Sequence, residues 1–232
     1  MRVVVTREAG RGDAVRSWLP DGAEVVDVPL TETRYEEPAA LERAARALPH
    51  AGAYAVLAVT SARGAQAALV VRPIAAPDSV VASIGPATSA ALRAGGLEVT
   101  VQGSGGAADL ADAIEFGPVL VVAARGAREE LIEQLSQRHL EVAHLTCYET
   151  RPREPDARGA EALSRADVIF IGAPSTWTVA RGYVSESAWV VVPGATTARA
   201  VAADHVRVLE GWDPSLRERL VTRTGGTSRH RQ

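Results

Sequence analysis

Hydroxyl-bearing and small residues directly follow a series of short apolar runs, and arginines accompany several of these stretches. Arg7 follows the first run. The later stretches are Thr60-Ser61-Ala62-Arg63, Gly85-Pro86-Ala87-Thr88, Arg125-Gly126, Pro174-Ser175-Thr176 and Gly194-Ala195-Thr196-Thr197. Such stretches offer backbone N–H donors, hydroxyls and fixed positive charge, but few acids or bases. This chemistry suits a ligand with many carboxylates or phosphates, contacted from several turns at once.

A purely structural explanation of the same pattern stays open. Ser and Thr are common helix N-caps, each contributing about 1 kcal/mol, and small residues are common in tight turns between strand and helix. For any single turn this explanation outweighs ligand binding. Its repetition over several turns favours anion binding for the set as a whole.

Composition excludes whole classes of chemistry. The chain has 232 residues with a formal net charge of −3, and every basic side chain is Arg, because the sequence contains no Lys. Schiff-base, pyridoxal-phosphate and Walker-type phosphate sites are therefore excluded. The single Cys147 excludes an internal disulfide, and the five scattered His predict no metal site. We expect no cofactor, and the near-neutral charge argues against nucleic-acid binding.

The chain shows no secretory pattern and no apolar run near the ~20 residues of a membrane span. We therefore expect a soluble, cytoplasmic protein with no membrane partner. It should be a monomer, because no long apolar surface stripe is evident. The polar residues 226–232 are expected to form a flexible tail.

Short apolar runs alternate with Ala-, Leu- and Arg-rich segments of helical character, which predicts an α/β protein with doubly wound parallel sheets. The strands are predicted at Val3–Val5, Glu24–Val28, Ala55–Val59, Val80–Ile84, Glu98–Val101, Val119–Val122, Val142–Leu145, Val168–Ile171 and Trp189–Val192. In such sheets ligands bind beyond the carboxyl ends of the strands, where the polar turns described above begin.

An internal repeat predicts two similar domains. Residues 23–34 align with residues 140–151 at an offset of 117, and five of the twelve positions are identical. Polar, Pro-bounded segments at 31–38 and 146–155 predict two connectors. One domain would then be split, formed by 1–34 and 153–225, and the other continuous over 38–145. Tandem domains divided near Gly117 are the alternative.

Tyr148 lies in the second connector, where a phenol could donate a hydrogen bond or a proton. An aromatic that only packs at this position is an equally good interpretation.

Taken in order, these motifs resemble those of the uroporphyrinogen-III synthase family from end to end. The similarity rests on the opening strand with Thr6-Arg7, Thr60-Ser61-Ala62-Arg63-Gly64, Ile84-Gly85-Pro86-Ala87-Thr88, Arg125-Gly126, Cys147-Tyr148-Glu149-Thr150, Ala173-Pro174-Ser175 and Gly194-Ala195-Thr196-Thr197-Ala198. The chain departs from the family pattern at Ala173, where Ser is usual, and at Ala195, where Pro is usual. Ala123-Ala124 also precede Arg125 where Pro is common.

The resemblance implies two α/β domains joined by a two-stranded connector. It also implies a linear tetrapyrrole substrate, hydroxymethylbilane, which is cyclised with inversion of ring D to uroporphyrinogen III and water without a cofactor. Tyr148 would be the candidate acid and the turn residues the substrate contacts. A non-catalytic two-domain protein that binds an anionic small molecule is the alternative. A flavodoxin-like redox domain would need a phosphate loop with aromatics, which the sequence lacks.

Overall fold

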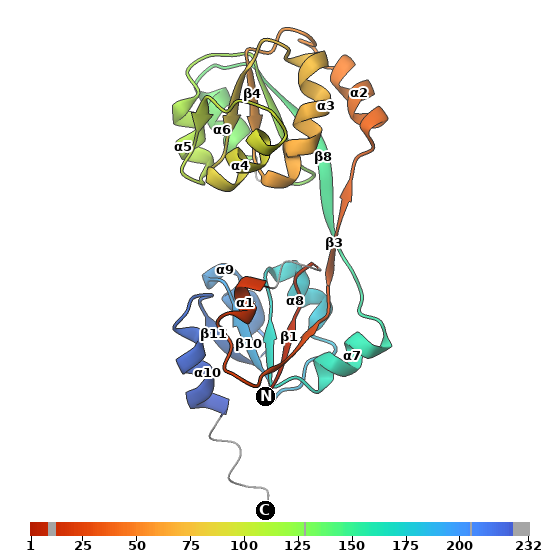
Figure 1. Ribbon diagram of the computed structural model, residues 1–232, viewed down its shortest axis with the longest axis vertical. Coiled ribbons are helices and arrows are strands. Elements are labelled where there is room, and N and C mark those ends of the chain that lie inside the picture. The colour runs from red at the N-terminus through yellow and green to blue at the C-terminus, as the bar shows by residue number, and fades with distance from the viewer. Residues whose placement is uncertain (9–12, 128, 205, 225–232) are drawn as a thin grey trace, which may run out of the picture. The chain divides into compact units, whose positions relative to one another are not determined.

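The computed structural model of the chain divides into two compact units (Figure 1). Unit 1 comprises Met1–Glu32 with Arg151–Gln232, and unit 2 comprises Thr33–Thr150. The structure describes residues 1–8, 13–127, 129–204 and 206–224. Gly117, where a tandem division was considered, therefore lies inside unit 2. The expected flexible tail, residues 226–232, lies outside the described residues.

Unit 1 is built on a parallel sheet with the strand order β11-β10-β9-β1-β2. Its strands are β1 (Arg2–Val5), β2 (Glu24–Asp27), β9 (Val168–Phe170), β10 (Trp189–Val192) and β11 (Arg207–Glu210). Its helices are α1 (Asp13–Arg16), α7 (Ala157–Ser164), α8 (Pro174–Ala180), α9 (Ala195–Ala202) and α10 (Leu216–Thr224).

Unit 2 contains a second sheet with the strand order β3-β8-β7-β4-β5-β6, in which β8 to β6 run parallel. The strands are β3 (Thr31–Tyr35), β4 (Val56–Val59), β5 (Val80–Ser83), β6 (Val101–Gln102), β7 (Val119–Ala124) and β8 (Val142–Pro152). The helices are α2 (Pro38–Arg46), η1 (Ala62–Gly64), α3 (Ala65–Ala75), α4 (Pro86–Ala94), α5 (Ala107–Ala113) and α6 (Glu130–Gln137).

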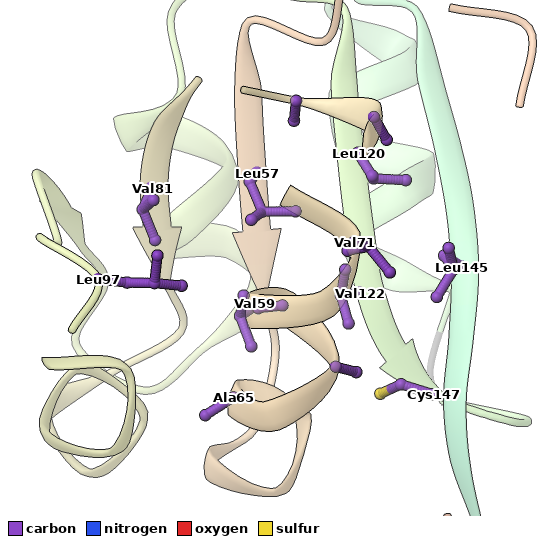
Figure 2. Close-up of a cluster of buried hydrophobic side chains, with 14 of the residues drawn as sticks. Leu57, Val59, Ala65, Val71, Val81, Leu97, Leu120, Val122, Leu145 and Cys147 are labelled. Atoms are coloured by element: carbon purple, nitrogen blue, oxygen red, sulfur yellow. The ribbon is translucent and has the colours of Figure 1, made fainter. Parts of the chain in front are cut away.

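Helices cover both faces of each sheet. Successive residues of a strand point to opposite sides, so an almost wholly apolar strand needs helices on both faces to bury its side chains. In β4, Leu57 and Val59 pack under α2, α3 and α4. Figure 2 shows both beside Ala65 and Val71 of α3. Val56 and Ala58 pack on the other side, under α5 and α6. Unit 1 repeats this arrangement with one core beneath α7, α8 and α9 and another beneath α1 and α10. Helices on both faces of each sheet confirm the predicted α/β fold with two similar parallel sheets.

The structure corrects the predicted strand Glu98–Val101. The observed strand β6 covers only Val101–Gln102, and Thr100 adds a single backbone hydrogen bond to Val81. β6 is the edge strand, with β5 as its one neighbour in the sheet, so no second partner extends it.

The segments predicted as connectors are themselves strands. β3 and β8 are neighbours in the sheet, and β8 continues without a break from Val142 to Pro152. The predicted strand end at Leu145 was therefore too early, because the polar residues in the second half of β8 were interpreted as a loop. Both strands pass through the unit boundaries, which fall at 32/33 and 150/151.

Within the described ranges, no helix combines the length and the apolar character needed to cross a bilayer.

Candidate functional site

Tyr148 lies at a β-bulge between β7 and β8. Ala123 pairs with Thr146, but the next residue, Ala124, pairs with Tyr148, so Cys147 is left without a partner in the ladder. A bulge places two residues opposite one and changes the direction of the side chains that follow it. Consistent with this, the neighbours Cys147 and Tyr148 both belong to the same buried cluster, instead of pointing to opposite faces.

Three side chains from two other elements surround Tyr148. Its phenol donates a hydrogen bond to Ser61 Oγ over 3.0 Å. The guanidinium carbon of Arg63 lies 5.8 Å from the centre of the Tyr148 ring, and the Tyr35 ring lies 5.9 Å away at a tilt of 46°. The turn after β4 and the end of β3 therefore fix the orientation of a tyrosine that is only 7% exposed.

Arg125, at the end of β7, is held by its backbone and by two carboxylates. Its N–H donates to the Tyr148 carbonyl over 2.7 Å. Its guanidinium lies 3.4 Å from Glu36 and 3.4 Å from Glu149. Exposed ion pairs add little stability, but two of them limit the directions that the arginine can take. Glu36 and Glu149 were not singled out from the sequence, because nothing in their spacing indicates this pairing.

A cavity of about 730 Å³ opens at the carboxyl end of the unit 2 sheet. It brings together Thr60, Gly126 and Tyr148, which the sequence predicted as site residues. Val121, Ala123 and Leu131 are among its apolar lining residues. The Gly105-Gly106 turn and the first residues of α5 and α6 complete the wall. A cavity of this size accommodates a small organic ligand.

The cavity carries more acid and base groups than we expected. Asp109, Glu129, Glu130 and His144 line it, whereas the sequence pattern predicted turns with few acids or bases. Asp109 accepts a hydrogen bond from Ser104. Desolvation lowers the pKa of His144, and the nearby Glu129 carboxylate opposes that shift. These four cavity residues could not be predicted from the sequence. The three acids lie at the starts of helices and His144 in a strand, which are ordinary positions for them.

Gly85 lies where two turns of unit 2 approach each other closely. A Cβ built on Gly85 would lie 3.2 Å from Gly105 Cα. Pro86, next in the chain, is exposed, whereas Thr88 is only 3% exposed. The turn therefore presents backbone and a proline ring rather than the Thr88 hydroxyl.

The turns of unit 1 divide the predicted hydroxyls in the same way. Thr176 and Thr197 are buried beneath the first turns of α8 and α9. Their neighbours Ser175 and Thr196 are exposed. The remaining predicted positions at these turns are the exposed Pro174 and Ala195 and the half-buried Gly194.

These hydroxyls are not helix N-caps. The N-cap positions of α4, α8 and α9 are Gly85, Ala173 and Gly194, and no described side chain caps these three helix ends. By contrast, Asp156 caps α7 by accepting from Gly159 N over 2.7 Å. The capping explanation of the Ser and Thr pattern is therefore wrong at these turns. Pro86 and Pro174 have no N–H, and Thr88 and Thr197 donate theirs to the Gly85 and Gly194 carbonyls. The other first-turn N–H groups of these helices can bind a ligand.

Arg7 lies over a tryptophan at the carboxyl end of the unit 1 sheet. Its guanidinium carbon is 5.3 Å from the centre of the Trp212 ring, and that ring lies 6.0 Å from Phe170. Thr6 Oγ1 donates to the Phe170 carbonyl over 2.6 Å, which ties β1 to β9 directly beside Arg7. Trp212 was missed from the sequence, where only its position after a Gly at a strand end could have indicated it.

Two further properties of the described residues concern metal and thiol chemistry. No three His, Cys, Asp or Glu side chains among them converge as metal ligands. Burial raises the pKa of Cys147 to about 12. The thiol points into the apolar cluster of Figure 2 and donates to the Ala123 carbonyl, so it is not a nucleophile at neutral pH.

Comparison with known proteins gives one consistent result. A family model described as uroporphyrinogen-III synthase HemD matches residues 20–211. Uroporphyrinogen-III synthetase from Helicobacter pylori has a similar structure, with 16% identity and a TM-score of 0.65, over 93% of this chain and 95% of that one. A mutant uroporphyrinogen III synthase from the extremely thermophilic bacterium Thermus thermophilus matches at 16% identity and a TM-score of 0.57, over 99% and 98%. No curated protein sequence matches the chain.

Proposed function

The chain belongs to the uroporphyrinogen-III synthase family, and from this premise we propose how its residues bind hydroxymethylbilane and close it into uroporphyrinogen III. The family consists of enzymes of tetrapyrrole biosynthesis. Their substrate is a linear tetrapyrrole with eight carboxylates, and the reaction closes the ring, inverts ring D and releases one water.

Chemically, the terminal C–O bond breaks, and the hydroxyl leaves with one added proton as water. The resulting azafulvene is attacked by the substituted carbon of ring D. The spiro intermediate fragments at the bond between that carbon and the bridge to ring C, and the inverted ring D recloses through its unsubstituted α-carbon. That carbon then loses its proton, which balances the proton taken up by the leaving hydroxyl. Without the enzyme the substrate closes without inversion. The protein therefore has to impose geometry on the reacting ends, and positioning of this kind can lower a barrier by several kcal/mol.

The observation that carries the proposal is the placement of Tyr148. Its phenol lies 3.0 Å from Ser61 Oγ, and Tyr148 lines the cavity together with Thr60 and Gly126. In our proposal Tyr148 donates a proton or hydrogen bond to the leaving hydroxyl. Rotation of the two hydroxyls lets Ser61 donate back to the phenol oxygen, which keeps the ring in place during that step.

The two kinds of polar surface suit different parts of the substrate. The helix N-termini without side-chain caps, together with Arg7, Arg63 and the exposed Ser175 and Thr196, suit its carboxylates. The acidic groups of the unit 2 cavity repel carboxylates and instead suit the pyrrole N–H groups, which are hydrogen-bond donors. They also favour the positive charge of the azafulvene. The acids that the sequence did not predict thus orient the substrate in this proposal.

The test is incubation with freshly prepared hydroxymethylbilane, followed by separation of the product isomers. We expect the type III isomer from the wild-type chain and only type I from heat-denatured chain. Ser61→Ala should lower kcat/KM by about fivefold, the effect of one lost hydrogen bond of about 1 kcal/mol. If the native chain gives only the type I isomer, the protein binds without catalysis, and the proposal is wrong.

We also propose that the chain acts as a monomer in the cytoplasm. In support, the three exposed large hydrophobics among the described residues lie in separate segments, namely Tyr35 in β3, Phe116 in the loop after α5 and Val221 in α10. The one thiol is buried in an unpaired, reduced form. Sedimentation equilibrium at micromolar concentration tests the monomer, and a mass near twice 24.3 kDa would contradict it.

A further inference from the structure

We propose that Tyr35 contacts a pyrrole ring of the substrate, which extends the site from Tyr148 along β3. The inference rests on the proposed function and concerns a residue that neither the sequence motifs nor the cavity lining include. It follows from three properties of Tyr35 within unit 2, namely its exposure, its rigidity and the chemistry beside it.

Tyr35 is unusually exposed for an aromatic residue in a strand. Its side chain is 56% exposed, the highest value among the exposed large hydrophobics of the described residues. An aromatic ring at the surface leaves apolar area in water that burial would remove, so a rigid exposed ring beside a site is a candidate ligand contact. Phe116, at 49%, offers a comparison, because it is similarly exposed but follows α5 and has no ring contact with Tyr148.

The position of Tyr35 is fixed by its neighbours. Its ring lies 5.9 Å from the Tyr148 ring. The next residue, Glu36, donates its N–H to the Cys147 carbonyl over 3.0 Å, and its carboxylate lies 3.4 Å from Arg125. The backbone is thus anchored to β8 directly at the bulge. A ring that is already held in place loses little conformational entropy when a ligand packs on it.

The chemistry beside Tyr35 matches a pyrrole that bears carboxylates. Pyrrole is a flat π system, and aromatic rings attract one another in offset or edge-to-face arrangements. Tyr148, the neighbour of Tyr35, has the Arg63 guanidinium 5.8 Å from its ring centre, so a positive charge is available near the same place. A pyrrole on Tyr35 would lie next to the phenol that we assign to the leaving hydroxyl.

The experiment measures KM and kcat for hydroxymethylbilane with Tyr35→Ser, Tyr35→Leu, Tyr35→Phe and Phe116→Ser. We expect Tyr35→Ser and Tyr35→Leu to raise KM by about three- to tenfold, the range of one lost aromatic contact. Tyr35→Phe should stay within about twofold of wild type because it keeps the ring. Phe116→Ser removes a similarly exposed ring elsewhere and should leave KM unchanged.

An unchanged KM in Tyr35→Ser would overturn the contact between Tyr35 and the substrate. The proposed function would still stand in that case, provided that the wild-type chain yields the type III isomer. An equal defect in Tyr35→Phe would also overturn it, because the hydroxyl and not the ring would then carry the effect. If Tyr35→Ser does not fold, Tyr35→Leu decides, since it keeps an apolar side chain without the π system. A wild-type chain that makes no type III isomer would overturn the proposed function together with this inference.

Discussion

The two units share one scaffold but differ in what stands at the carboxyl ends of their strands. The order β2-β1-β9-β10-β11 in unit 1 corresponds to β8-β7-β4-β5-β6 in unit 2. β1 and β7 begin 117 residues apart, at Arg2 and Val119, which is the offset of the sequence repeat. The repeated strands explain why an internal sequence repeat could predict two similar domains.

Beyond the strands the correspondence ends. Unit 2 has a bulge, a tyrosine hydrogen-bonded to a serine, and a cavity with three acids and a histidine. Unit 1 instead has Arg7 stacked on Trp212. Helices that no described side chain caps occur in both units, at α4 in unit 2 and at α8 and α9 in unit 1. In our proposal, one scaffold supports two roles, with proton chemistry at Tyr148 in unit 2 and anion binding at Arg7 in unit 1.

The largest effect should come from Tyr148→Phe. Removing the phenol hydroxyl takes away the proton donor that we place in unit 2, and we expect kcat to fall by about a hundredfold with an unchanged circular-dichroism spectrum. Tyr183→Phe is the matched control in unit 1, because that hydroxyl donates to Glu154 over 3.1 Å at the surface. Equal turnover for Tyr148→Phe and wild type would remove Tyr148 from the mechanism.

Replacing Trp212 tests the role of unit 1. Trp212→Leu removes a ring packed on Phe170 and the support under Arg7. We expect a loss of about 2 kcal/mol, seen as a thermal midpoint lower by about 5 °C. KM should rise about threefold as Arg7 loses its cation–π contact. Trp18→Leu, in the same cluster, should lower the midpoint without changing KM; a KM change in both variants would contradict the anion-binding role of unit 1.

The smallest effect concerns the thiol that unit 2 contains and unit 1 lacks. Burial raises the pKa of Cys147 from 9.0 to about 12, so the folded chain keeps a proton that the unfolded chain releases above about pH 9. Stability from this group is therefore complete below about pH 9 and declines between about pH 9 and 12, by about 1 kcal/mol at pH 10.

The measurement compares thermal midpoints at about pH 8 and about pH 10, on either side of the ordinary thiol pKa, for wild type and Cys147→Ala. The chain has no Lys, so tyrosines are the main other groups that titrate in this range, and both proteins contain them. Cys147→Ala should lose less stability between the two pH values. Identical losses would show that the thiol is ionised in the folded protein or does not contribute.

Sequence reasoning succeeded where a short pattern has one physical solution. Apolar runs such as Val56–Val59 can only be buried on both sides, and Ala- and Leu-rich segments between them can only cover the two faces. Gly85 was singled out as a turn residue, and the structure shows a close approach to Gly105 that favours a residue without a side chain.

Features that depend on pairing could not be predicted. The bulge at Cys147 arises from the register of β8 against β7, which no local pattern of either strand contains. Arg125 meets Glu36 from 89 positions away, and Trp212 reaches Arg7 from the other end of the chain. His144 lies in β8, within the predicted strand Val142–Leu145, and it is exposed. It lines the cavity, which the packing of α5 and α6 creates and no local pattern indicates.

The helices that start without a side-chain cap have a thermodynamic consequence. At Ala173 the missing cap costs α8 about 1 kcal/mol, whereas the glycines that start α4 and α9 cost only a few tenths. A ligand oxygen that accepts a hydrogen bond from these amides takes the place of the missing side-chain cap and recovers the stability lost with it. Substrate or product should then act as a thermal protectant, raising the midpoint of unfolding as its concentration exceeds the dissociation constant. The ligand would therefore contribute to the stability of the folded enzyme by capping helices that the chain itself leaves uncapped.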